Sequence, residues 1–228
     1  MFPELPEKWE KQLEGELSFV RQKGFYLTHP IKAQKTNTLG LIFSFDAKIK
    51  KKIYDFVKQS IPNTLLSKLY IQPYEGYHIT IQSSKDRPKD TKKLVELTKQ
   101  YFQDSKSLKG SIFAIYPSDN SLLGITTIDA YLIKKTRADL AKIFKSCEAN
   151  PKYNPKTNIY HFNYWSTQTW VSLARPTSKF TDAEIELTTK LPKSVFTNVV
   201  FDKAILTYND PFFTPKFSEI LAEINLIS

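Results

Sequence analysis

The strongest constraint on the fold is an order of strand-like and helix-like segments that occurs roughly twice along the chain. The run Leu39–Phe45 is almost continuously apolar, which is typical of a buried strand, and a basic amphipathic helix is predicted after it at 48–60. The remaining segments of the pattern are expected as strands at 69–73, 77–82, 111–117, 122–128, 169–174 and 194–208, and as helices at 91–102, 132–148, 182–191 and 217–227. Each half therefore carries one strand with a short polar motif, flanked in sequence by helices.

The domain organisation follows from this repeat and from the chain length. With 228 residues and no low-complexity linker between the halves, the chain predicts two pseudo-symmetric lobes of one domain over 38–228. An amphipathic helix is predicted at 6–22, within an N-terminal helical extension over 1–37 that packs on the main body.

Charge leaves two interpretations open. The chain has 33 Lys and Arg against 23 Asp and Glu, a net charge of +10, which favours a polyanionic partner such as RNA. The Lys-rich stretches, among them 48–52, lie on predicted helices, where exposed lysine is well tolerated. A solvated surface without a polyanion explains the charge equally well.

The single cysteine, Cys147, excludes a disulfide framework and is predicted to belong to the core. The histidines and this cysteine show no zinc-ligand spacing, so no metal is expected. There is no secretory signal pattern and no apolar run long enough to span a membrane. These features predict a soluble cytoplasmic protein without a membrane partner.

The segment 77–82, with the sequence YHITIQ, is the first that can carry chemistry. A period of two places His78, Thr80 and Gln82 on one face, with Tyr77 and the two isoleucines on the other. An imidazole and a hydroxyl two residues apart can address one phosphate, because the histidine handles a proton and the hydroxyl donates to an oxygen.

The segment 168–175, with the sequence QTWVSLAR, has a similar form. The same period places Gln168, Trp170 and Ser172 on one face, so a small polar residue again follows two places after a bulky ring.

HITI, followed about ninety residues later by WVSLARP, resembles the paired His-x-Thr/Ser motifs of the 2H phosphoesterase superfamily. That superfamily includes bacterial 2′-5′ RNA ligase-like proteins and RNA 2′,3′-cyclic phosphodiesterases, and the resemblance covers roughly 38–210. It implies an α+β fold in which two lobes of antiparallel sheet with outer helices surround a central cleft. It also implies that one histidine activates the nucleophile, that the other protonates the leaving oxygen, and that neither metal nor cofactor takes part.

Carried across by position, the resemblance assigns His78 and Thr80 to the first motif and Ser172 to the hydroxyl of the second. Trp170 stands where the second histidine is expected, and an indole N–H only donates. Losing one positioned acid or base costs roughly 10²–10⁴-fold in rate, or about 3–5 kcal/mol. His161, nine residues before the tryptophan, is a candidate substitute base.

Several other residues are candidate substrate contacts. Trp170 either fills a vacated cleft or stacks a base of single-stranded RNA, and Arg175 either pairs with a phosphate or forms a surface salt bridge. The remaining candidates at the site are Tyr77, Gln82 and Gln168.

The leading hypothesis is therefore slow phosphodiester chemistry on an RNA 2′,3′-cyclic phosphate, a 2′-5′ linkage or a related small nucleotide, by a chain expected to be a monomer. The alternative is a catalytically inactive RNA- or nucleotide-binding relative. A third hypothesis is a structural protein whose N-terminal helix contacts a partner.

Overall fold

The computed structural model describes residues 7–27, 38–84, 87–149, 153–154, 159–160, 168–209 and 218–227. Its helical elements are α1 (Glu7–Lys23), α2 (Ala47–Ser60), α3 (Asn63–Leu66), the 3₁₀ turn η2 (Tyr74–Gly76), α4 (Thr91–Phe102), α5 (Ala130–Ser146) and α7 (Asp182–Thr189). Its strands are β1 (Thr38–Phe45), β2 (Leu69–Ile71), β3 (Ile79–Ser84), β4 (Leu108–Pro117), β5 (Leu122–Thr126), β6 (Tyr153–Asn154), β7 (Ile159–Tyr160), β8 (Thr169–Pro176), β9 (Ser194–Asn209) and β10 (Glu219–Asn225). The α+β prediction is confirmed.

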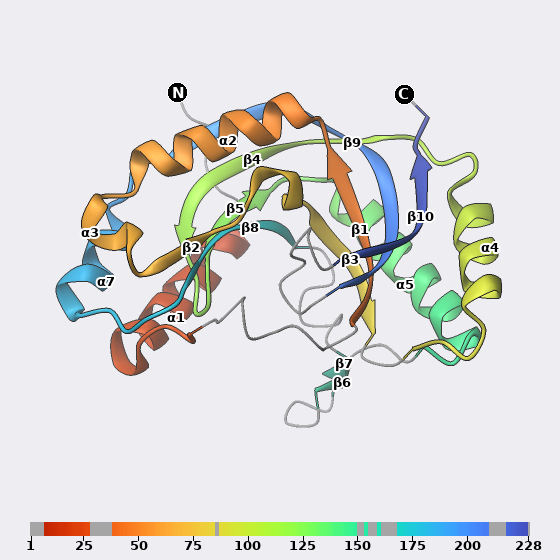
Figure 1. The fold of residues 1–228 in the computed structure, drawn as a ribbon, viewed down its shortest axis with the longest axis horizontal. Coiled ribbons are helices and arrows are strands. Elements are labelled where there is room, and N and C mark those ends of the chain that lie inside the picture. Colours follow the sequence, from red (N-terminus) through yellow and green to blue (C-terminus); the bar gives the residue numbers. More distant parts are fainter. Residues whose placement is uncertain are drawn as a thin grey trace.

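The main sheet is antiparallel and runs in the order β2-β8-β5-β4-β9-β1-β3, with β10 also paired to β9. The long strand β9 joins the two lobes, because 201–209 pairs with β1 while 194–201 pairs with β4. Figure 1 shows it as a long curved strand. The lobes are thus the two ends of one continuous curved sheet, with β3 in one and β8 in the other.

The two faces of the sheet are covered by different helices. On β4, Ile112 belongs to the main core together with apolar residues of α2, α4 and α5, whereas its neighbour Phe113 packs in a separate cluster with Trp9 of α1. Successive side chains of a strand point to opposite faces, so α1 lies on the face opposite to the main core. In Figure 1, α1 and α2 accordingly lie on opposite sides of the sheet.

Local signals in the sequence explain where several helices begin. The Asp46 carboxylate accepts hydrogen bonds from the backbone N–H groups of Lys48 and Ile49 and caps α2. Thr181 and Glu184 form a reciprocal capping box at the start of α7. The helix predicted at 91–102 matches α4.

The helix predicted at 217–227 is wrong, because residues 219–225 form β10. This strand pairs with β9 along an edge that β4 leaves uncovered, and it there satisfies the backbone groups of β9. The apolar residues of this segment are spaced in a way that also suits a helix. Pairing with β9 decides in favour of the strand.

Two further expectations can be compared with the structure. Cys147 is buried in the main core, as predicted, at the C-terminal end of α5. Within the described residues, no helix combines the length and the hydropathy that a membrane crossing requires.

Candidate phosphate-binding site

His78 lies between the turn η2 and the first residue of β3. Its Nδ1 is 2.6 Å from the carbonyl oxygen of Gly76, and a carbonyl oxygen only accepts, so Nδ1 carries the proton of the neutral ring. The other nitrogen, Nε2, is therefore the one with a lone pair. In this tautomer the neutral ring can accept a proton only at Nε2.

The surroundings of His78 favour its neutral form. Burial of the ring lowers the pKa to about 4, although the Gly76 hydrogen bond opposes the shift. The positive charges of Lys50 and Arg175 lower the pKa further. At neutral pH the imidazole is uncharged and able to accept a proton.

A cavity of about 150 Å³ opens beside this ring, lined by the first lobe. Its polar lining comes from β1, α2, η2 and β9 as well as from the histidine, and Ser218 precedes β10. The residues that line it are Ile42, Ser44, Lys50, Glu75, Gly76, Tyr77, His78, Ile205, Thr207, Asn209, Ser218 and Ile220. A cavity of about 150 Å³ has room for a phosphate group.

Thr80 lies directly opposite Ile42, one of the residues lining that cavity, and is partly buried. The backbone of its strand is held from outside by Arg137 of α5, which donates to the carbonyl oxygens of Thr80 and Ile81 at 3.2 Å each. Burial lowers the pKa of this guanidinium to about 10, so it remains charged at neutral pH. Arg137 thus fixes the first motif without lining the cavity.

The second motif reaches the first through Arg175. Its Nη2 donates to the Ser172 hydroxyl at 3.1 Å, and its charge is one of those that lower the pKa of His78. Strands β3 and β8 also contact each other, although they are not paired in the sheet. The Arg175 guanidinium of β8 thus acts electrostatically on His78, and it donates to the Ser172 hydroxyl.

Trp170 belongs to a different environment. It lies opposite Ile125 of β5, which lies opposite Phe113 of β4, and this row packs under α1. The Trp9 ring meets the Trp170 ring edge-on, with centroids 6.4 Å apart. This is the geometry expected if the tryptophan fills a vacated cleft, because the ring packs against the chain's own N-terminal helix.

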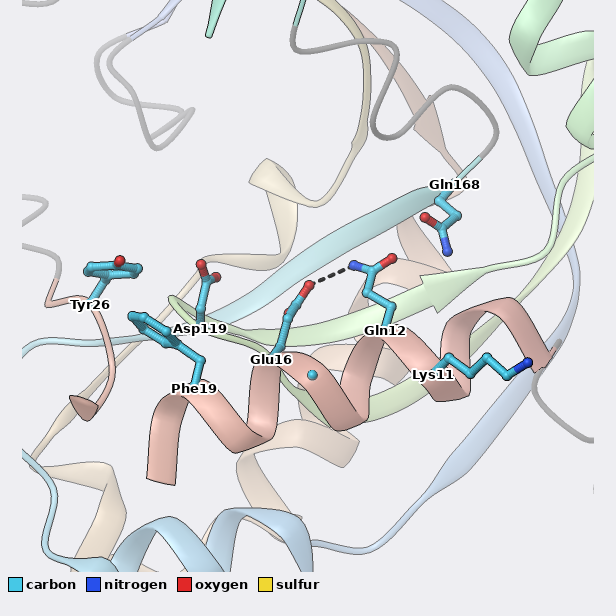
Figure 2. A pocket seen from close by; sticks show the side chains of 8 residues that line it. Lys11, Gln12, Glu16, Phe19, Tyr26, Asp119 and Gln168 are labelled. Carbon is cyan, nitrogen blue, oxygen red and sulfur yellow. Dashed lines mark hydrogen bonds between the residues drawn. The ribbon is translucent and has the colours of Figure 1, made fainter. Parts of the chain in front are cut away.

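Gln168 is buried at the start of β8 and lines a second pocket, of about 670 Å³, that runs along α1 (Figure 2). Figure 2 shows its amide directed toward α1, where Gln12 donates to the Glu16 carboxylate at 2.6 Å. Burial raises the pKa of Glu16, and likewise that of Asp119 on the β4–β5 turn. Gln168 is thus placed with the extension and not with the cavity beside His78.

Two of the remaining candidates are buried away from solvent. Tyr77 is a core residue with no exposed surface, and burial raises the pKa of its hydroxyl. A register shift between Leu41 and Ile42 places Gln82 opposite Leu41, a core residue, so the expected shared face with Thr80 is wrong. His161, the proposed substitute base, lies outside the described residues.

Lys50, Asn209 and Arg137 are functional candidates that the sequence motifs do not indicate. The sequence places Lys50 in a basic stretch expected to be exposed, yet it is buried on the same face of α2 as Ile53 and Val57, three and seven residues further on. That spacing is the signal that could have found it. Arg137 has a comparable signal, because it lies four residues after Ile133 and three before Leu140 on the buried face of α5. Asn209 has none, because its role depends on contacts with distant segments.

Among the described residues, no group of three or more His, Cys, Asp or Glu side chains is arranged to hold a metal ion. The site is built mainly from nitrogen and hydroxyl donors and is suited to an anion.

Comparison with solved structures places this architecture with the phosphoesterase fold. TT0787 of Thermus thermophilus is similar with a TM-score of 0.57 and 12% identity, over 83% of this chain and 97% of that one. E. coli LigT complexed with ATP is similar with a TM-score of 0.55 and 10% identity, over 85% of this chain and 100% of that one. A crystal structure described as a phosphoesterase gives a TM-score of 0.56 at 10% identity, over 85% of this chain and 100% of that one.

No family model matches the sequence, and no curated protein sequence matches it. At identities of 10–12%, the likeness establishes the fold. The resemblance seen in the two sequence motifs is therefore confirmed at the level of the architecture.

Proposed function

We propose that this chain binds the terminal phosphate of RNA or of a small nucleotide and hydrolyses 2′,3′-cyclic phosphates slowly. The observation that carries the proposal is that Arg175 of β8 donates to Ser172 and also lowers the pKa of His78, just before β3, although β3 and β8 are not paired in the sheet. A neutral imidazole beside a guanidinium and a hydroxyl is suited to activate a nucleophile against a bound phosphate.

In this reaction His78 accepts a proton from the attacking water. Thr80, Ser172 and Arg175, which are outside the lining of the cavity beside His78, hold the phosphate oxygens that face away from it. The likeness to LigT supports a nucleotide as the ligand, because structures of that protein contain ATP and 3′-AMP. The net charge of +10 supports a polyanionic substrate.

Slow turnover follows from Trp170. An indole cannot exchange a proton in the accessible pH range, and this ring packs against Trp9. Without a second positioned histidine we expect a rate about 10²–10⁴-fold below that of a two-histidine enzyme.

The experiment measures hydrolysis of 2′,3′-cyclic AMP by the wild type and by the His78→Ala variant. We expect turnover by the wild type and a loss of at least about 100-fold in the variant. Tyr131→Ala is the matched control, because Tyr131 is 76% exposed on α5. Equal rates for the wild type and the His78→Ala variant would contradict the proposal.

A second candidate function is nucleotide binding without turnover, which the packing of Trp170 under α1 favours. It predicts salt-sensitive binding of an oligoribonucleotide that His78→Ala weakens, with no product formed from 2′,3′-cyclic AMP. Product formation that depends on His78 excludes this candidate.

A further inference from the structure

The cavity beside His78 contains a buried ammonium group that the two sequence motifs do not account for. Lys50 is 7% exposed, and its Nζ donates to the Ser44 hydroxyl at 2.6 Å and to the Glu75 carbonyl oxygen at 3.3 Å. An ammonium has three donors, so one N–H remains beyond these two contacts, and Nζ also lies 5.4 Å from the centre of the Phe45 ring. Burying a charged lysine costs desolvation free energy, which a lysine on the surface avoids.

Asn209 provides an independent sign that this cavity receives a ligand. The side chain lines the cavity and is 3% exposed, and its Nδ2 has no hydrogen-bond partner among the described residues. The Thr207 hydroxyl lies 3.2 Å from Asn209 Oδ1 and 2.9 Å from the Glu219 carbonyl oxygen, and its single proton can serve only one of these acceptors. A buried donor without an acceptor is costly, and a phosphate oxygen would satisfy it.

We propose that the phosphate occupies this cavity between His78, Lys50 and Asn209, and that Lys50 supplies the proton donor that Trp170 cannot. The inference rests on the proposed function and names the group that completes it. The acid, Lys50, and the base, His78, then line the same cavity.

The proton balance of the step is complete without a further reactant. Water attacks the phosphorus of the 2′,3′-cyclic phosphate and loses its proton to His78 Nε2. The bond from phosphorus to one ribose oxygen breaks, and that oxygen takes a proton from Lys50 Nζ. The product is a phosphomonoester with a free ribose hydroxyl, and solvent returns a proton from His78 to Lys50.

The electrostatics of the cavity give the two groups the protonation states that this step needs. Burial lowers the pKa of Lys50 to about 8, against the opposing attraction of Asp202. Lys203 lowers the pKa further and Glu75 raises it. At pH 7 the lysine is mostly protonated while His78, with a pKa of about 4, is neutral. A general acid works best when its pKa is near the working pH.

Other charged or titratable groups also face this site. Burial raises the pKa of the Tyr77 hydroxyl and keeps it neutral, while the Arg175 guanidinium stays charged. Glu75 also lines the cavity, so titration of its carboxylate and titration of His78 could both lower kcat/KM at acidic pH. Glu75→Gln distinguishes the two, because it should leave the acidic limb near pH 4 and move the basic limb to lower pH.

The test compares the pH profile of kcat/KM for 2′,3′-cyclic AMP in the wild type, Lys50→Met and Lys50→Arg. Lys52→Met is the matched control, because Lys52 is exposed on the same helix. We expect a wild-type profile that rises near pH 4 and falls near pH 8. Both Lys50 variants should lose about 100-fold or more in kcat and the fall near pH 8, since arginine keeps the charge but donates no proton.

Binding of inorganic phosphate separates the two roles of the lysine. Lys50→Arg should retain phosphate binding, while Lys50→Met should weaken it about tenfold or more, and thermal unfolding of each variant shows that the fold is kept. Full activity of a folded Lys50→Met variant with an unchanged basic limb would overturn the inference, while a loss in His78→Ala would leave the proposed function standing. No turnover by the wild type would overturn the proposed turnover and the role of Lys50 with it.

Discussion

Strands β3 and β8 carry related motifs but meet different neighbours. His78, before β3, borders a cavity with a buried lysine and a buried asparagine, whereas Trp170 of β8 packs against Trp9 of α1. The two strands still contact each other, and the charge of Arg175 on β8 lowers the pKa of His78. The surroundings of His78 are thus polar, while part of the face of β8 packs against the N-terminal helix.

This difference bears on the hypothesis that the N-terminal helix contacts a partner protein. Trp9 and Val20 of α1 are buried within the chain itself, against β4, β5 and α7. The apolar face of the helix is therefore used for intramolecular packing.

The largest expected effect is a loss of stability when the contact between α1 and β8 is removed. Trp9→Ala should lower the free energy of unfolding by about 3 kcal/mol, because a buried indole and its contact with Trp170 are both lost. Urea denaturation measures the change, and Tyr131→Ala, at an exposed position, should change it by less than about 0.5 kcal/mol. A change below about 1 kcal/mol for Trp9→Ala would contradict the packing of α1 against β8.

The next effect is a dependence of stability on pH that arises from His78. The folded pKa of about 4 lies below the ordinary value near 6.5, so the unfolded chain binds more protons between these two values. Stability is therefore complete above pH 6.5 and falls as the pH is lowered toward 4, by at most about 3 kcal/mol from this group. Unfolding free energies of the wild type minus those of His78→Gln isolate the contribution, and a difference that does not vary with pH would contradict the buried neutral ring.

A smaller effect is expected at the link between the two strands. Arg175→Met removes the donor to Ser172 and one of the charges near His78. We expect KM for 2′,3′-cyclic AMP to rise about tenfold, or about 1.4 kcal/mol, with a smaller change in kcat. A fall in kcat at constant KM would instead assign the guanidinium to the chemical step.

The smallest expected effect is the change in turnover when a histidine is placed in the second motif. Trp170→His should raise turnover by less than about twofold, because the position packs against Trp9 and one exchanged ring does not reopen the face under α1. A rise of tenfold or more would show that the new imidazole reaches the phosphate and that the β8 side is intact.

Much of the fold was predictable because its signals are local. The apolar run at β1, the alternation along β9, the spacing of α4 and the capping box of α7 each reflect interactions within a few residues. The C-terminal segment was predicted wrongly because its strand state depends on pairing with β9. The bulge that turns Gln82 inward is likewise set by β1 and not by its own strand.

The candidate site was predictable only in its motifs. His78, Thr80 and Ser172 were predicted from the resemblance of HITI and WVSLARP to paired His-x-Thr/Ser motifs, which are visible directly in the sequence. Lys50 and Asn209 are brought to the same cavity by α2 and β9, and Arg137 supports β3 from α5. Such contacts between distant elements leave little trace in a single sequence.

The decisive measurement is a titration with inorganic phosphate, followed through the imidazole resonances of His78 and the indole N–H of Trp170 in one NMR spectrum. Phosphate near His78 should shift its resonances and raise its pKa above about 4, because an anion favours the imidazolium, while the Trp170 indole should not respond. A response of the Trp170 indole with a silent His78 would contradict the assignment of phosphate binding to the β3 side.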